Sequence, residues 1–238
     1  MLKSATTFGL VLALVACAAI AAPLAPAADP EKPIWPIQFD VPFGLNWVGG
    51  TLINNASSHF YYNFDLEAQV IQYDTHCFPL AHWNAVFYPC KLYFTAKPAI
   101  YLASPANGID CCLFQDGVGT VPPNFLGGFN YSGSTQIIKD YYGVSHNTYH
   151  WKGIEDFGYW TDVSSEVDVQ FQDGPTGVHW NFGNFNVVNQ TASIFALPAG
   201  NCETKCNFLL EKSGASGITS KLVDPMLKLA QTVHQMMN

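Results

Sequence analysis

The sequence predicts a mainly β protein: an antiparallel β-sandwich or half-barrel followed by a short C-terminal helix. Short segments rich in aromatic and β-branched residues alternate with Gly, Pro, Asn and Asp turn signals along most of the chain. Residues 167–172 and 178–182 show strict period-two alternation on both sides of a turn, which is typical of a hairpin with one solvated face. Helical periodicity is almost absent before residue 224, which favours a sheet protein.

The first twenty-odd residues resemble a secretory signal peptide. Lys3 precedes an apolar run from residue 8 to residue 20, and a small-x-small cleavage site ends at Ala21. Cleavage there leaves 238 − 21 = 217 residues, expected to form a single secreted β domain over residues 22–238. The run is too short to span a membrane. The alternative is a bacterial lipoprotein acylated at Cys17, which the apolar residues beyond this cysteine disfavour.

The first half of the mature chain contains the elements of an antiparallel meander. An Ala/Pro-rich lead-in covers residues 22–33. Two strand candidates follow it, and Gly49 and Gly50 end the second. Turn residues 65–67 separate two aromatic runs, which indicates a hairpin. The strands expected in this half are residues 34–39, 42–48, 59–64, 68–73, a pair within 83–95, 100–103 and 111–115.

The second half begins after a Pro-Pro stop and a glycine-rich stretch. Its expected strands are residues 135–143, 147–152, 157–163, 167–172, 178–182 and 194–197. A small-residue linker then leads to an amphipathic helix over residues 225–237, with Asp224 as its N-cap and Pro225 in the first turn. We expect its apolar face to pack on the sheet.

Composition argues against nucleic-acid binding and against disorder. The chain carries a formal charge of −8 and no arginine, with 12% charged and 49% hydrophobic residues. Nucleic-acid binding requires clustered cations that displace counterions, so this chain is not expected to bind DNA or RNA. The hydrophobic content supports an ordered core and argues against disorder.

Six cysteines remain after removal of the leader, and an even number in an exported chain points to three disulfides. A bond between the neighbours Cys111 and Cys112 would strain the peptide between them, so each is expected to reach a distant cysteine. We predict one bridge between Cys77 and Cys90. Two further bridges join the neighbouring pair to Cys202 and Cys206, in an order that the sequence leaves open.

Three sequons suit the same compartment. Asn55, Asn130 and Asn189 each begin an Asn-x-Ser/Thr tripeptide, so each is a candidate glycosylation site that should lie on the surface.

Large aromatic side chains recur on the strand candidates. Ordinary core packing is the favoured explanation, because such residues are usually buried. The functional alternative is a ring-lined pocket for an apolar or lipid-like ligand, since curved sheets can enclose cavities. The candidate lining residues are Trp83, Phe87, Tyr93, Tyr149, Trp151, Trp160, Phe171, Trp180 and Phe182.

Metal and catalytic signatures are weak. His146 and His150 would share a strand face, as would Glu166 and Asp168, but solvated side chains explain both pairs without a metal. The sequence contains no nucleophile-elbow, phosphate-loop or dinucleotide motif, so no catalytic residue, metal ligand or cofactor is predicted. A hydrolase stays open as the alternative, with two convergent acids or a hydroxyl near His150 or His179 as its structural requirement.

The order of several features resembles that of ependymin-related secreted proteins. These features are the strand pair FYYNF…QVIQYD, the Cys111–Cys112 segment followed by PPNFL, the stretch TYHWKGIEDFGYW and the late FALPAGNCETKC. The resemblance covers most of residues 60–206. It implies two antiparallel sheets over a deep apolar pocket, a secreted glycoprotein, calcium association, homodimers, and roles in extracellular matrix or adhesion.

Two functions therefore follow from the sequence. The first is a secreted, disulfide-bonded, non-catalytic glycoprotein that binds an apolar or lipid-like ligand, acts in extracellular matrix or adhesion, or does both. The alternative is a secreted hydrolase that acts on glycans or esters.

Overall fold

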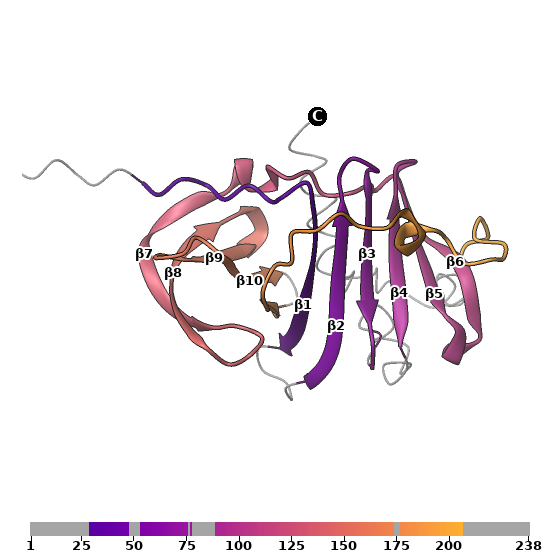
Figure 1. Cartoon of the computed structure of the whole chain (residues 1–238), viewed down its shortest axis with the longest axis horizontal. Coiled ribbons are helices and arrows are strands. Elements are labelled where there is room, and N and C mark those ends of the chain that lie inside the picture. The colour runs from indigo at the N-terminus through magenta and orange to yellow at the C-terminus, as the bar shows by residue number, and fades with distance from the viewer. Residues whose placement is uncertain (1–28, 48–52, 76, 78–88, 174–176, 207–238) are drawn as a thin grey trace, which may run out of the picture.

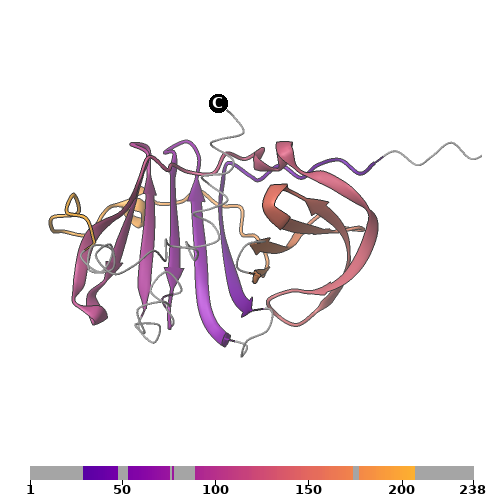
Figure 2. The same ribbon diagram turned by 180° about the vertical axis from the view of Figure 1, so that it is seen from behind.

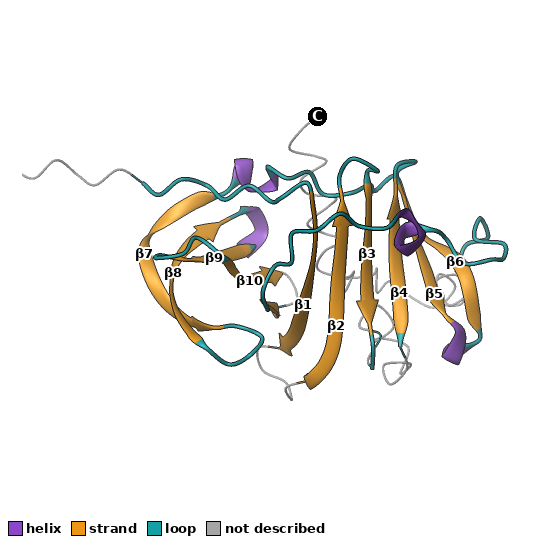
Figure 3. Ribbon diagram, in the orientation of Figure 1, coloured by secondary structure: helices purple, strands orange, loops and turns teal. Residues whose placement is uncertain are grey.

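The computed structural model describes residues 29–47, 53–75, 77, 89–173 and 177–206, and the remaining residues are drawn as a grey trace in Figure 1. Strands dominate this part of the chain, and its helices are short 3₁₀ turns (Figure 3). The strands are β1 (Gln38–Trp47), β2 (Ile53–Asn63), β3 (Ala68–Tyr73), β4 (Cys90–Thr95), β5 (Ala99–Ser104), β6 (Ile109–Asp116), β7 (Asn130–Lys139), β8 (Ser145–Lys152), β9 (Gly158–Asp162), β10 (Asp168–Asp173) and β11 (Val178–Phe182). The 3₁₀ helices are η2 (Pro105–Asn107), η3 (Phe125–Gly128), η4 (Ile154–Asp156) and η5 (Ala192–Phe195).

All eleven strands belong to one antiparallel sheet, in the order β6-β5-β4-β3-β2-β1-β11-β10-β9-β8-β7. Two meanders, β1 to β6 and β7 to β11, join where β1 pairs with β11. In Figure 1 the first meander forms the broad wall at the right, and the second curls at the left. The prediction of a mainly β, antiparallel fold is confirmed. The predicted helix 225–237 lies outside the described residues.

Most of the predicted strands appear with shifted ends. The two short strands expected at residues 34–48 are one strand, β1. The turn expected at residues 65–67 joins β2 to β3 and includes residue 64 as well. The hairpin of β10 and β11 pairs Phe171 with Trp180, as the alternation predicts. The strand predicted at residues 194–197 is wrong, because this segment forms η5 and covers the sheet instead of extending it.

The main core lies on the inner face of the sheet. The residues that cover it include the crossing segment, residues 117–129, which leads from edge strand β6 to the opposite edge strand β7. Trp35 of the lead-in is central to this core: its backbone N–H donates to the carbonyl of Pro123, and its ring contacts Phe39, Phe125 and two further rings. The lead-in and the crossing segment both run along the top edge of the sheet in Figure 1. Burial of these rings stabilises both meanders together.

A second, smaller cluster lies on the outer face of β3 to β6. The return segment, residues 183–206, follows β11 and packs Phe195 and Cys202 against Val70, Tyr93 and Tyr101. It crosses in front of the first meander in Figure 1 and behind it in the reverse view of Figure 2. The first meander is therefore covered on its outer face as well as buried on its inner one.

Three disulfides close the fold and confirm the predicted pairs. Cys77 bonds Cys90, while Cys111 bonds Cys202 and Cys112 bonds Cys206, which settles the order. Successive side chains of a strand point to opposite faces. Cys111 accordingly lies with the outer cluster and Cys112 with the inner one, so the return segment wraps around the edge of β6. Backbone hydrogen bonds join Leu113 to Thr204 and Cys206 along that edge.

We predict that the two bridges at β6 contribute non-additively to stability. They close loops of similar span, 91 and 94 residues, so either one alone removes most of the loop entropy of the unfolded chain. Replacing one pair by serines should cost about 2 kcal/mol, whereas replacing both pairs should cost about 7 kcal/mol, more than the sum. Urea unfolding of the two single-bridge variants and the double variant measures this, and additive losses would contradict it.

Candidate functional site

The predicted ring candidates divide between different parts of the sheet. Trp83 and Phe87 lie outside the described residues. Trp151, Phe171, Trp180 and Phe182 are buried in the inner core, with Tyr149 packed against it at partial exposure. These rings stack and cross one another, with 4.4 Å between the ring centroids of Phe43 and Trp180, so they pack as core in the described part of the chain.

Tyr93 and Trp160 lie apart from that group. Tyr93 belongs to the outer cluster. Trp160 stacks on His150, with centroids 4.5 Å apart and planes 2° from parallel, and its indole N–H donates to Gln136. Gly158 leaves room for this stack, because a Cβ there would lie 2.5 Å from the Trp160 ring. The seven candidates among the described residues therefore do not converge on one surface.

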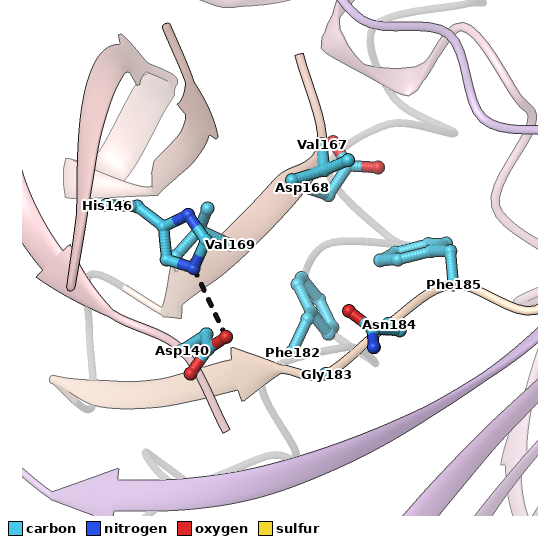
Figure 4. A pocket seen from close by; sticks show the side chains of 9 residues that line it. All are labelled: Asp140, His146, Val167, Asp168, Val169, Phe182, Gly183, Asn184 and Phe185. Carbon is cyan, nitrogen blue, oxygen red and sulfur yellow. Dashed lines mark hydrogen bonds and ion pairs between the residues drawn. The ribbon is translucent and has the colours of Figure 1, made fainter. Parts of the chain in front are cut away.

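A pocket opens where the beginnings of β8 and β10 meet the end of β11. Its volume is about 150 Å³. Figure 4 shows three groups of side chains around the pocket: Asp140 with His146, Phe182 with Phe185, and Asp168. Exposed Val167 and Asn184 also line the pocket and place it at the surface. Of the predicted ring candidates in the described residues, Phe182 lines it.

Asp168 reaches the inner face because of a β-bulge. The register between β10 and β9 shifts at Val169, so Asp168 pairs with Thr161 and leaves the face of Gln170 that strict alternation predicts. Its carboxylate accepts a hydrogen bond from the Tyr159 hydroxyl, which in turn accepts one of 2.8 Å from the Trp35 indole. Burial raises the pKa of Asp168 to about 7, although the Tyr159 hydrogen bond acts in the opposite direction.

The second oxygen of Asp168 is the unusual feature of the pocket. Oδ1 is closed off from solvent and has no hydrogen-bond partner among the described residues. A buried carboxylate oxygen without a partner costs free energy, and native structures rarely retain one.

On the other side of the pocket, His146 bridges two carboxylates. Its Nε2 lies 3.1 Å from Asp140 Oδ2, and its Nδ1 lies 3.1 Å from Asp162 Oδ2. An imidazole can donate to both only as the cation. Burial alone would lower the pKa of His146, but hydrogen bonds to the two carboxylates outweigh it and raise the pKa. Asp162 also accepts hydrogen bonds from Ser164 and Ser165, which hold its pKa below the ordinary range against the effect of burial.

The other titratable residues considered in the sequence, Glu166, His150 and His179, are not among those that line the pocket. The predicted shared face of Glu166 and Asp168 is wrong: Glu166 is an exposed turn residue with φ of 59°, outside the strand. Burial lowers the pKa of His150, which stacks on Trp160, and that of His179, which bonds Gln170. No group of three or more ligand-type residues able to hold a metal occurs in the described part of the chain.

The pocket could have been found only in part from the sequence. Asp168 and Phe182 stand out in the alternating hairpin, but the bulge that turns Asp168 inward leaves no clear sequence signal. Asp140 and Asp162 meet His146 through sheet register, which no local pattern reveals. Of the three sequons, Asn130 and Asn189 are exposed, while the side chain of Asn55 lies outside the described set.

Comparison with known proteins adds no relative. A scan against protein-family models and a search of curated proteins found no match. These comparisons give the resemblance to ependymin-related proteins no support, and it stays a prediction. Among the described residues, no helix has the length and apolar character needed to cross a membrane.

We predict that His146 titrates above its ordinary pKa of 6.5, whereas His150 and His179 titrate below it. Because the folded pKa of His146 is raised, its stabilising contribution is complete below pH 6.5 and is lost as the pH rises through the folded pKa. NMR titration of the imidazole protons measures all three. Asp140→Asn should move the His146 pKa back toward 6.5, and an unchanged value would contradict the bridge.

We predict that Asp168→Asn stabilises the protein at alkaline pH. The folded pKa of about 7 exceeds the ordinary 3.8, so the folded state holds its proton longer and stability falls as the pH rises from about 4 to about 7. The neutral amide avoids this loss, with a gain on the order of 3 kcal/mol at pH 8 and much less at pH 4.5. Urea unfolding at both pH values tests it. The control Asp110→Asn, at an exposed position of β6, should show no such difference.

Proposed function

We propose that this chain is an exported, non-catalytic binding protein that holds a small ligand in the pocket bounded by Asp140, Asp168 and Phe182. The observation that carries the proposal is the pocket of about 150 Å³ itself, whose lining combines the rings of Phe182 and Phe185 with the acidic residues Asp140 and Asp168. An apolar wall with a few polar groups is the usual composition of a ligand site. The three disulfides are compatible with export to an oxidising compartment.

The size of the pocket restricts the ligand. Pockets that hold drug-sized molecules have volumes of roughly 300 Å³ or more. The volume here is about 150 Å³, so a small molecule, or the terminal group of a larger one, fits better than a whole lipid chain. A lipid-like ligand within the sheet stays a prediction that depends on space other than this pocket.

The broader assignment includes surface features. We propose glycans at the exposed Asn130 and Asn189, in keeping with a secreted glycoprotein. The matrix or adhesion role, the calcium association and the homodimer that the resemblance implies belong to the same proposal. None of them requires the pocket, so they can hold together with ligand binding.

A hydrolase is the second candidate, and one observation favours it. Asp140 and Asp168 line one pocket, and a carboxyl group with a pKa near 7 suits a general acid. Against it, Asp140 already accepts hydrogen bonds from His146 and from the backbone N–H groups of Tyr142 and Val144. A carboxylate fixed by three donors is poorly placed to act as a nucleophile or base.

Blocking the mouth of the pocket tests the binding function. We expect an NMR screen of small fragments with apolar, acidic, basic and neutral polar members to find saturable binding near Phe182 and Phe185. Val167→Trp at the rim should abolish it by steric exclusion. The control Val187→Trp, at a position 63% exposed and outside the pocket lining, should retain it.

Two results would overturn the binding function. One is a fragment set that shows no saturable binding at the pocket, and the other is equal binding to Val167→Trp and the control. Turnover of glycoside or ester substrates that Asp168→Asn abolishes would establish the hydrolase instead.

A further inference from the structure

We infer that His146 is a pH-sensitive latch: as a cation it joins the β7–β8 turn (residues 140–144) to the β9–β10 turn (residues 163–167), and it separates them when it loses its proton. Both turns border the pocket, because Asp140 of the first and Val167 of the second are lining residues. The latch follows from contacts that need no ligand. Only its effect on ligand affinity rests on the proposed binding function.

The latch consists of one imidazole between two carboxylates. His146 Nε2 lies 3.1 Å from Asp140 Oδ2, the contact drawn in Figure 4. His146 Nδ1 lies 3.1 Å from Oδ2 of Asp162, the last residue of β9. The side chain of His146 is 20% exposed, so its ring can exchange a proton with water. The imidazole is therefore the link between the two turns.

Each carboxylate also holds its own turn through its other oxygen. Asp140 Oδ1 accepts the backbone N–H groups of Tyr142 and Val144, and Asp162 Oδ1 accepts those of residues 164–165. Each turn is thus organised around its own carboxylate without the imidazole. What the imidazole adds is the connection from one turn to the other.

This connection requires the imidazolium form. A neutral imidazole carries one N–H, and its other nitrogen presents a lone pair. Whichever nitrogen of His146 keeps the proton, the other one faces a carboxylate oxygen, and this contact is repulsive. One of the two contacts then opens, and the turns are no longer joined.

The charges around His146 act in the same direction. On β7 the residue opposite His146 is the uncharged Ile138. On β10, Asp168 lines the same pocket, and burial raises its pKa to about 7. The described lining residues after residue 180 are uncharged and the lining includes no lysine. Loss of the imidazolium charge therefore leaves Asp140, Asp162 and Asp168 close together, which favours separation of the turns.

The direction of the pH dependence follows from these contacts. Burial alone would lower the pKa of His146, but its hydrogen bonds to the two carboxylates raise the pKa. The latch is therefore closed below the ordinary value of 6.5 and opens as the pH rises through the raised pKa.

Amide hydrogen exchange reports on the two turns separately. The Tyr141 N–H donates to the carbonyl of Phe182 and holds the β7–β8 turn on β11, while the Asp162 N–H donates to the carbonyl of Val167 across the β9–β10 turn. On the intact, oxidised protein we expect at least one of these amides to lose protection as the pH rises through the His146 pKa, which NMR titration locates in the same sample. By linkage, the loss should be about tenfold for each unit by which the pKa of the latched ring exceeds that of the released ring.

A distant amide separates local opening from general destabilisation. The Gly153 N–H donates to the carbonyl of Phe157 at the opposite end of the β8–β9 hairpin. Its protection factor, relative to the exchange rate of an unstructured chain at the same pH, should stay constant. An equal loss at all three amides would overturn the latch, because it would indicate global unfolding.

Asp140→Asn is the decisive variant. The amide oxygen can keep the two backbone N–H groups of the turn, and the amide nitrogen can donate to the unprotonated Nε2 of a neutral ring whose Nδ1–H donates to Asp162. The turns should then stay joined above the His146 pKa, so the loss of protection should disappear. Asp168→Asn, which removes the other group that titrates near neutrality, and the exposed control Asp110→Asn should both keep it.

The effect on the pocket is measured with benzyl alcohol, which does not titrate. In the Asp168→Asn background, its affinity from NMR chemical-shift titration should fall at least about fivefold as the pH rises through the His146 pKa, since separated turns no longer form the pocket wall. The additional change Asp140→Asn should remove this dependence.

The outcomes distinguish the latch from the binding function. Constant protection of both turn amides in the parent protein, or an undiminished loss in Asp140→Asn, would overturn the latch. Constant benzyl alcohol affinity while the turn amides lose protection would overturn its effect on the pocket. If benzyl alcohol does not bind on either side of the pKa and the fragment screen is also blank, the binding function fails, and the exchange data still decide the latch.

Discussion

The fold depends on how the chain is fastened at the edge of β6. A strand sends neighbouring side chains to opposite faces, so the adjacent Cys111 and Cys112 can bind partners on both sides of the sheet. Cys202 meets the outer face and Cys206 the inner one, and the few residues between them must pass around the strand edge. That passage also occupies backbone groups of Leu113 that would otherwise be exposed to edge-to-edge association. The same short segment thus ends the sheet, fastens the return segment over the outer cluster and joins the last described residues to the core.

The opposite end of the molecule is organised by hydrogen bonds between buried side chains. Trp35 enters the core from the lead-in, fills the space under the crossing segment and donates to Tyr159 of β9. The Tyr159 hydroxyl in turn donates to the carboxylate of Asp168 at the start of β10, where the bulge turns this side chain inward. The lead-in therefore fixes the orientation of a pocket residue more than a hundred positions later.

The sequence was informative wherever the structure follows local rules. Period-two alternation identified β10 and β11, and turn residues identified the hairpin of β2 and β3. The cysteine count, together with the predicted leader, led to the disulfide pairs that the structure contains. The sequence failed where a single residue changes the register. One extra residue at Val169 moves Asp168 to the other face, and Glu166 leaves the strand through a left-handed turn. Residues 194–197 have strand-like composition, but they pack as η5 on an already complete sheet, so tertiary contact overrides propensity. The cluster of His146, Asp140 and Asp162 depends on pairing between β8 and β9, which no window of sequence contains.

Stability alone does not explain Asp168. The pocket places a carboxyl group of raised pKa next to a second acidic residue, and one of its oxygens is left without a partner among the described residues. The neutral isostere asparagine would fit the same space and remove the cost of the charge, so a chain optimised only for folding gains nothing from aspartate here. His146, by contrast, has a carboxylate at each ring nitrogen, so its positive charge and both of its N–H groups are satisfied without a ligand. The two sides of one pocket thus differ: His146 has a carboxylate partner on each ring nitrogen, whereas Asp168 keeps one oxygen without a partner among the described residues.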